Sequence, residues 1–75
     1  MLNMVIGTLE TLIWDKRTIW IHTDDGKNVC LQFGKGYVSV LRYLWGKNVQ
    51  CLYDADDKLC EIGPVGKVKL FKVKP

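Results

Sequence analysis

The sequence predicts a single, mainly β domain with one helix, and three observations lead to that prediction. The chain has 75 residues, which is enough for one domain but not for two. Short runs rich in β-branched and aromatic residues end at turns made of Gly, Asp and Lys. One later run, from Tyr37 to Trp45, has the spacing of a helix instead. Its 48% hydrophobic and 25% charged residues are typical of a globular protein.

The first half of the chain is expected to form three strands. The strands expected are Val5–Trp14, Thr18–Thr23 and Lys27–Phe33. Gly7 lies inside the first run and indicates a bend or bulge there. Polar turns separate the runs, at Asp15–Arg17 and at Asp24–Gly26. Consecutive strands joined by such short turns pair antiparallel, so these three form a meander.

The alternation of side chains predicts the length of the second turn. A three-residue loop, Asp24–Gly26, places Ile21 opposite Val29 and keeps both on one apolar face. A two-residue loop would place Ile21 opposite Cys30 and Ile19 opposite Gln32. Because a shift of one residue exchanges the two faces, the three-residue loop is favoured.

The same test on the first turn also favours three residues, Asp15–Arg17. It pairs Ile13 with Ile19 and Thr11 with Ile21 on the inner face, and Trp14 with Thr18 and Leu12 with Trp20 on the outer face. The expected consequence is that Trp14 and Trp20 both lie on the outer face. Two tryptophans on that face are either covered by another segment or form a contact surface.

A helix and two further strands complete the expected order. Tyr37, Val40, Leu41 and Leu44 recur at helical spacing and form one apolar face, and Gly46 follows as a C-terminal cap. Asn48–Tyr53 is the fourth strand, with Val49, Cys51 and Tyr53 on one face. Leu59–Val73 is the fifth, interrupted at Gly63–Gly66, where Pro64 indicates a bulge, kink or edge.

Three strands, a helix and two strands is the order of the OB-fold, which the chain resembles over nearly its whole length. The resemblance is one of element order, with no sequence motif. It implies a small five-stranded barrel with the helix between the third and fourth strands. An SH3-like barrel is the alternative, although that fold usually has only a short 3₁₀ turn at this position.

The cysteines and the start of the chain predict a location. There are three cysteines, an odd number, and Met1–Met4 has no basic segment followed by a long apolar run. The sequence therefore predicts free thiols, no signal peptide and a cytoplasmic protein. No apolar run approaches the roughly 18 residues of a membrane span, so no membrane association is expected.

Catalytic and metal chemistry find little support in the sequence. His22, Cys30, Cys51 and Cys60 lack the close pair spacing of a zinc site. No nucleophile has an evident base and orienting group. Gly34-Lys35-Gly36 precedes the helix but lacks the full phosphate-loop pattern. The prediction is therefore a protein that is not an enzyme and holds no metal or other cofactor.

The strongest functional pattern combines aromatic with basic residues. The predicted binding residues are Trp14, Lys16, Arg17, Trp20, Gln32 and Lys35. Bases stack on aromatic rings while basic groups follow the backbone, so the pattern predicts a module that binds single-stranded DNA or RNA. The alternative is a protein-interaction or regulatory module, homodimeric through the same Trp patch. Four C-terminal lysines, Lys67, Lys69, Lys72 and Lys74, fit a nucleic-acid footprint, a solvated face or a protected sheet edge.

Overall fold

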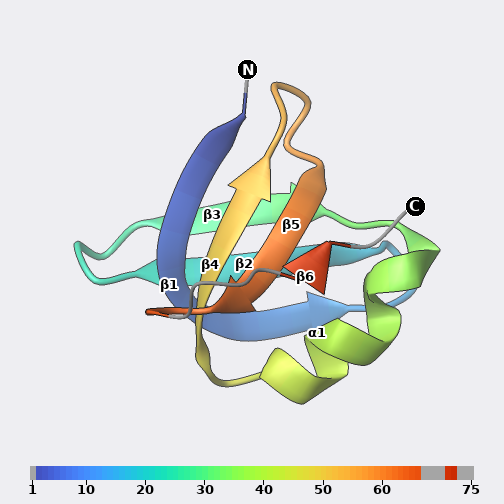
Figure 1. Ribbon diagram of the computed structural model, residues 1–75, viewed down its shortest axis with the longest axis horizontal. Helices are drawn as coiled ribbons and strands as arrows, with labels where there is room; N and C mark the ends of the chain where they lie inside the picture. Colours follow the sequence, from blue (N-terminus) through green and yellow to red (C-terminus); the bar gives the residue numbers. More distant parts are fainter. Residues whose placement is uncertain (1, 67–70, 73–75) are drawn as a thin grey trace.

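The computed structural model describes residues 2–66 and 71–72 of the chain. The elements are β1 (Asn3–Ile13), β2 (Thr18–Thr23), β3 (Asn28–Gln32), a 3₁₀ turn η1 (Lys35–Tyr37), α1 (Val38–Leu44), β4 (Asn48–Tyr53), β5 (Leu59–Pro64) and β6 (Phe71–Lys72). The domain is therefore mainly β, with one short helix between the third and fourth strands (Figure 1). Both features confirm the prediction.

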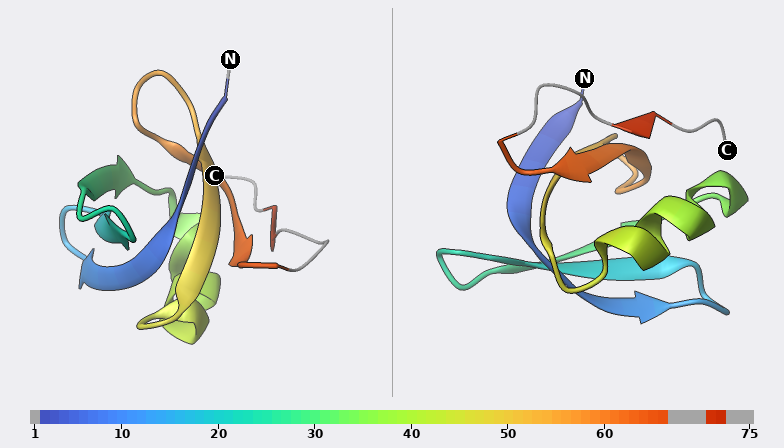
Figure 2. Two further views of the ribbon diagram at one scale, coloured as in Figure 1. Left: turned by 90° about the vertical axis from the view of Figure 1, so that its left-hand side faces the viewer. Right: turned by 60° about the horizontal axis from the view of Figure 1, so that its bottom comes forward.

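The strands form one antiparallel sheet in the order β3-β2-β1-β4-β5-β6. The long strand β1 pairs with β4 through its first half and with β2 through its second. Strand β1 therefore links one half of the sheet, β3 and β2, to the other half, β4, β5 and β6. Its strong bend curls the sheet, and α1 lies across the concave side (Figures 1 and 2). The described strands leave this sheet open, and its two halves meet at one isolated parallel bridge, Gln32–Lys58.

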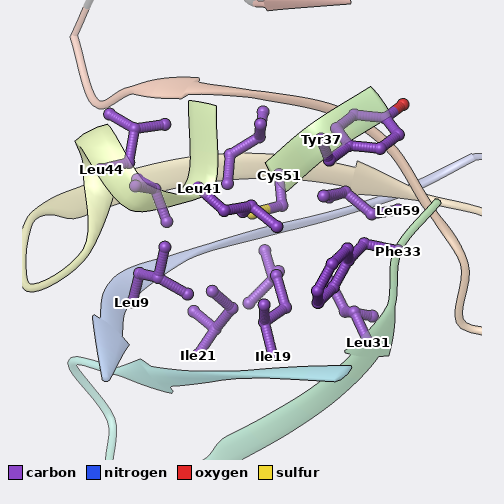
Figure 3. Close-up of a cluster of buried hydrophobic side chains, with 13 residues drawn as sticks. Leu9, Ile19, Ile21, Leu31, Phe33, Tyr37, Leu41, Leu44, Cys51 and Leu59 are labelled. Carbon is purple, nitrogen blue, oxygen red and sulfur yellow. The ribbon is translucent and has the colours of Figure 1, made fainter. Parts of the chain in front are cut away.

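The hydrophobic core fills the space between the curled sheet and the helix. Tyr37, Leu41 and Leu44 approach it from η1 and α1, as Figure 3 shows. The sheet contributes Val5, Leu9, Ile19, Ile21, Leu31, Val49, Cys51, Leu59 and Ile62, and Phe33 follows β3. The predicted helical face is confirmed, with Val40 half-buried against the same cluster.

The helix ends as its sequence indicates. Lys47 N–H donates to Leu44 O (2.9 Å), and Gly46 has a φ of 81°. A positive φ is inexpensive for glycine, which explains why the chain can turn away here. Two bonds then attach this turn to the sheet: Gly46 N–H donates to Leu9 O (2.8 Å) and Leu9 N–H to Lys47 O (3.0 Å).

Of the lengths predicted for the two turns of the meander, only one agrees with the structure. The three-residue loop Asp24–Gly26 is confirmed, because Ile21 pairs with Val29 and Thr23 N–H donates to Lys27 O (2.9 Å). The prediction of a three-residue loop at Asp15–Arg17 is wrong.

The first turn instead has four residues, Trp14–Arg17, between paired Ile13 and Thr18. Ile13 therefore does not face Ile19, and Thr11 does not face Ile21. Leu12 faces Ile19, and Thr11 faces Trp20. The cause is a β-bulge between Leu9 and Thr11, where Glu10 is the extra residue. The bulge lets Leu9 and Leu12 both contact the core, a combination that strict alternation cannot give.

The end of the chain is described in part. In β4, Val49 and Cys51 are buried and Tyr53 packs against the core, which confirms that they share a face. The predicted break at Gly63–Gly66 is confirmed, because β5 ends at Pro64, but the prediction of a single strand from Leu59 to Val73 is wrong: β6 turns back and pairs antiparallel with β5. Lys67, Lys69 and Lys74 lie outside the described residues.

Candidate binding surface at the Trp14 turn

The Trp14 turn, comprising Trp14, Asp15, Lys16 and Arg17, is fixed by backbone hydrogen bonds. Arg17 N–H donates to Trp14 O (3.2 Å), and Phe33 N–H donates to Arg17 O (2.9 Å). Arg17 has a φ of 50°, a left-handed conformation that closes the turn. These bonds join the turn to the residue that follows β3.

The Trp14 ring stands beside the core with much of its surface exposed. Its ring meets that of Phe33 edge-on, with centroids 6.1 Å apart and planes at 84°. The Arg42 guanidinium carbon lies 5.3 Å from the Trp14 centroid, over the ring. The side chain remains 38% exposed. Phe33 and Arg42 therefore orient an aromatic surface that solvent still reaches.

Several cationic side chains belong to the same end of the molecule. Lys16 and Arg17 are exposed within the turn itself. Lys35 is exposed at the start of η1, two residues beyond Phe33. Arg42 adds a fourth cation from α1. An oriented aromatic ring with one cation over it and further cations on the neighbouring segments can stack a planar group and attract the phosphates joined to it.

Trp20 lies apart from this group. It occupies β2 between Thr11 of β1 and Cys30 of β3, with 37% of its surface exposed. Its neighbours along the strand, Ile19 and Ile21, are buried in the core, so Trp20 faces outward. The prediction that Trp14 and Trp20 share the outer face is wrong, because the four-residue turn and the bulge direct Trp14 toward Phe33 and α1.

Gln32 also belongs with the outer face. It pairs with Thr18 and is exposed, and its backbone N–H donates to Asp57 O (2.8 Å). Of the six predicted binding residues, the structure places Trp14, Lys16, Arg17 and Lys35 on the turn or near Phe33. Trp20 and Gln32 lie on the outer side of the sheet.

Sequence reasoning missed Arg42 and a second exposed aromatic group. Arg42 lies off the apolar stripe of the helix, so its position predicted exposure but not its contact with Trp14. Tyr43 and Trp45 are 64% and 56% exposed at the end of the helix. Lys47 Nζ lies 4.0 Å from the Tyr43 centroid, and Trp45 Nε1 donates to Glu10 O (3.0 Å). Aromatic residues outside the helical stripe were the available signal.

The residues considered for metal or nucleophilic chemistry lie in different places. His22 Nδ1 is 3.0 Å from Asn28 Oδ1. Cys51 is buried, and this burial raises the pKa of its thiol to about 12. Cys30 and Cys60 are half-buried. Within residues 2–66 and 71–72, no three His, Cys, Asp or Glu side chains are arranged to hold a metal ion.

No helix among the described residues has both the length and the apolar character needed to cross a membrane. Comparison with protein-family models, curated protein sequences and solved structures gives no match to this chain. Function is therefore inferred from the chemistry of the Trp14 turn.

Proposed function

We propose that this chain is a binding module for single-stranded nucleic acid, with the Trp14 turn as its contact surface. The observation that carries the proposal is the exposed Trp14 ring, oriented by Phe33 and Arg42. A base stacks on such a ring regardless of its identity, since every base has a π-face. The role is one of binding, with no catalytic step.

The surrounding charges support a polyanionic ligand. Lys16 and Arg17 belong to the turn, Lys35 lies two residues beyond Phe33 and Arg42 lies over the Trp14 ring, while Asp15 is the acidic residue of the turn. Their positions on two turns and a helix suit a nucleic-acid strand that passes over the Trp14 ring with phosphates on either side. The expected specificity is low, because stacking and phosphate contacts read little sequence.

We further propose that the fold is an OB-like barrel. The order of three strands, a helix and two strands supports this assignment. So does the contact between the two halves of the sheet, where Gln32 N–H donates to Asp57 O (2.8 Å) and Gln32 bridges Lys58 in parallel. In this arrangement the Trp14 turn is the loop between the first two strands, a common ligand-binding loop of OB-folds.

The test is the fluorescence anisotropy of labelled single-stranded DNA and RNA oligomers, titrated with the protein at two salt concentrations. We expect saturable binding that weakens steeply with salt, because binding releases counterions from phosphates. Lys16→Gln and Lys35→Gln should each reduce the slope of log K against log salt by about 0.7. Lys27→Gln, in the Asp24–Gly26 hairpin, is the matched control and should leave the slope unchanged.

The two tryptophans provide a second matched pair, because their exposure is nearly equal, at 38% and 37%. Trp14→Leu keeps apolar cover over Phe33 but removes the flat ring, and should weaken binding by about tenfold or more. Trp20→Leu should have little effect. Absence of binding at low salt, or sensitivity to Trp20 rather than Trp14, would contradict the proposal. Binding partners would then be sought among proteins, with little salt dependence expected.

A further inference from the structure

Strand β3 is the last strand at one end of the sheet formed by the described residues, so one of its edges has no neighbouring strand among them over most of its length. Thr23 N–H donates to Lys27 O, and Phe33 N–H donates to Arg17 O, both at 2.9 Å. Odd-numbered residues of this strand therefore direct their peptide groups toward β2. In an antiparallel pair the even-numbered residues direct theirs the other way, toward the free edge.

Only one end of that edge is occupied among the residues that the structure describes. Gln32 donates its N–H to Asp57 O (2.8 Å) and bridges Lys58. The peptide groups of Asn28 and Cys30 have no strand beside them within residues 2–66 and 71–72. Two N–H and two C=O groups are thus available for pairing.

The strand also lacks the features that usually protect a sheet edge. Natural edges carry lysine, proline, a bulge or an inward charge, which discourage pairing with another chain. Every side chain from Asn28 to Gln32 is neutral, and the strand has no proline. Its pairing with β2 is regular from His22 to Thr18. This edge is therefore chemically suited to accept another strand.

We propose that β3 pairs antiparallel with β3 of a second copy of this chain, about a two-fold axis at Val29. This register places Asn28 of one copy opposite Cys30 of the other, and the reverse. The four open peptide groups of each copy then form four hydrogen bonds between the chains. The two sheets become one continuous sheet across the axis.

A second copy is the favoured occupant because the strand is complementary to itself. Val29 meets Val29, amide side chains meet thiols, and no like charges face each other within the strand. A register centred on Cys30 would instead place the second copy against Gln32, whose N–H is already bonded to Asp57. The Val29 register avoids that end.

Sedimentation equilibrium over micromolar to millimolar protein tests the proposal, with a reversible doubling of mass expected. Cys30→Pro removes an outward N–H that makes no bond to β2, and proline is tolerated at such edge positions. It eliminates two of the four inter-chain bonds and should raise the dimer dissociation constant by about tenfold or more. Cys30→Ser keeps the N–H and should dimerise like the unchanged protein.

A crosslinking experiment covers the case in which Cys30→Pro fails to fold. In a Cys30→Ser, Cys60→Ser background, Val29→Cys should form a disulfide-linked dimer under mild oxidation. Facing residues at that non-hydrogen-bonded position lie about 4.5 Å apart at Cα, which a disulfide can span. Lys27→Cys in the same background faces Leu31 of the second copy and should not crosslink. A monomeric mass at every concentration, a dimer indifferent to Cys30→Pro, or equal crosslinking of both cysteines would each overturn the proposal.

Discussion

At the scale of single residues, Gly7 leaves no room for a side chain between β1 and β2. A Cβ atom there would lie 2.8 Å from the His22 carbonyl carbon and 2.9 Å from Ile21 Cγ2, and would also strike the His22 carbonyl oxygen. The sequence indicated a bend or bulge at Gly7. The bulge lies at Glu10 and not at Gly7, and Gly7 allows β1 to pack closely on the backbone of β2.

Gly7→Ala should therefore destabilise the fold by about 3 kcal/mol, because the obstacle is backbone and cannot rotate away. Chemical denaturation followed by circular dichroism measures the change. Gly46→Ala is the control: its Cβ meets nothing within 4 Å, and only the φ of 81° is strained. It should cost about 1 kcal/mol. Equal losses at the two positions would show that Gly7 is not sterically constrained.

Cys51 makes stability depend on alkaline pH. The pKa of its thiol is raised from 9.0 to about 12 in the folded chain by burial. The unfolded chain ionises first, so this contribution to stability is complete below pH 9 and is lost as the pH rises toward 12. The loss is about 1.4 kcal/mol per pH unit in this window. Cys51→Val, which cannot ionise, should show a shallower decline in urea denaturation measured at pH 8, 9 and 10; identical slopes would contradict the prediction.

At the scale of elements, η1 and α1 are held by the core rather than by their own ends. The helix has seven residues, too few to be stable alone in water, and no side-chain cap at its start. Leu41 and Leu44 are fully buried, while Tyr37 is buried and donates its hydroxyl to Cys60 O. The apolar stripe was enough to predict this element from sequence, whereas its short 3₁₀ entry was not predicted.

Leu41→Ala should cost about 3 kcal/mol of unfolding free energy, because it opens a cavity between α1 and the sheet. Tyr43→Ala, on the exposed side of the same helix, should cost less than about 1 kcal/mol. Thermal and urea denaturation of the pair measures the difference. Similar costs would mean that α1 packs through another face.

At the scale of the whole molecule, the curled sheet brings together segments that lie far apart in the chain. The bond from Gln32 N–H to Asp57 O joins the strand at one end of the sheet to the residues just before β5. It lies beside the core, since Phe33 and Leu59 are both buried next to it. This contact joins β3 to the segment before β5, and the bond from Phe33 N–H to Arg17 O (2.9 Å) holds the Trp14 turn next to Phe33.

Amide hydrogen exchange by NMR should separate the bonded and open groups of the β3 edge. In dilute protein the Gln32 amide should be protected, and the Cys30 amide should exchange at least about tenfold faster, because no residue among 2–66 and 71–72 accepts its N–H. Rising protein concentration should slow Cys30 selectively if β3 pairs with a second copy. Equal protection of the Gln32 and Cys30 amides in the monomer would contradict the assignment of Gln32 as bonded and Cys30 as open.

The sequence by itself determined the mainly β class, the order of the elements, the Asp24–Gly26 loop and the core face of the helix. These features depend on local periodicity and turn chemistry, which do not depend on the distant segments that each element packs against. Only the tertiary structure decided the bulge at Glu10, the four-residue turn and the contact of Arg42 with Trp14. The bulge allows Leu9 and Leu12 both to pack in one core. Whether both can pack there depends on the helix and strands on the other side of that core, which local sequence does not specify. The separation of Trp14 from Trp20 follows from the same cause.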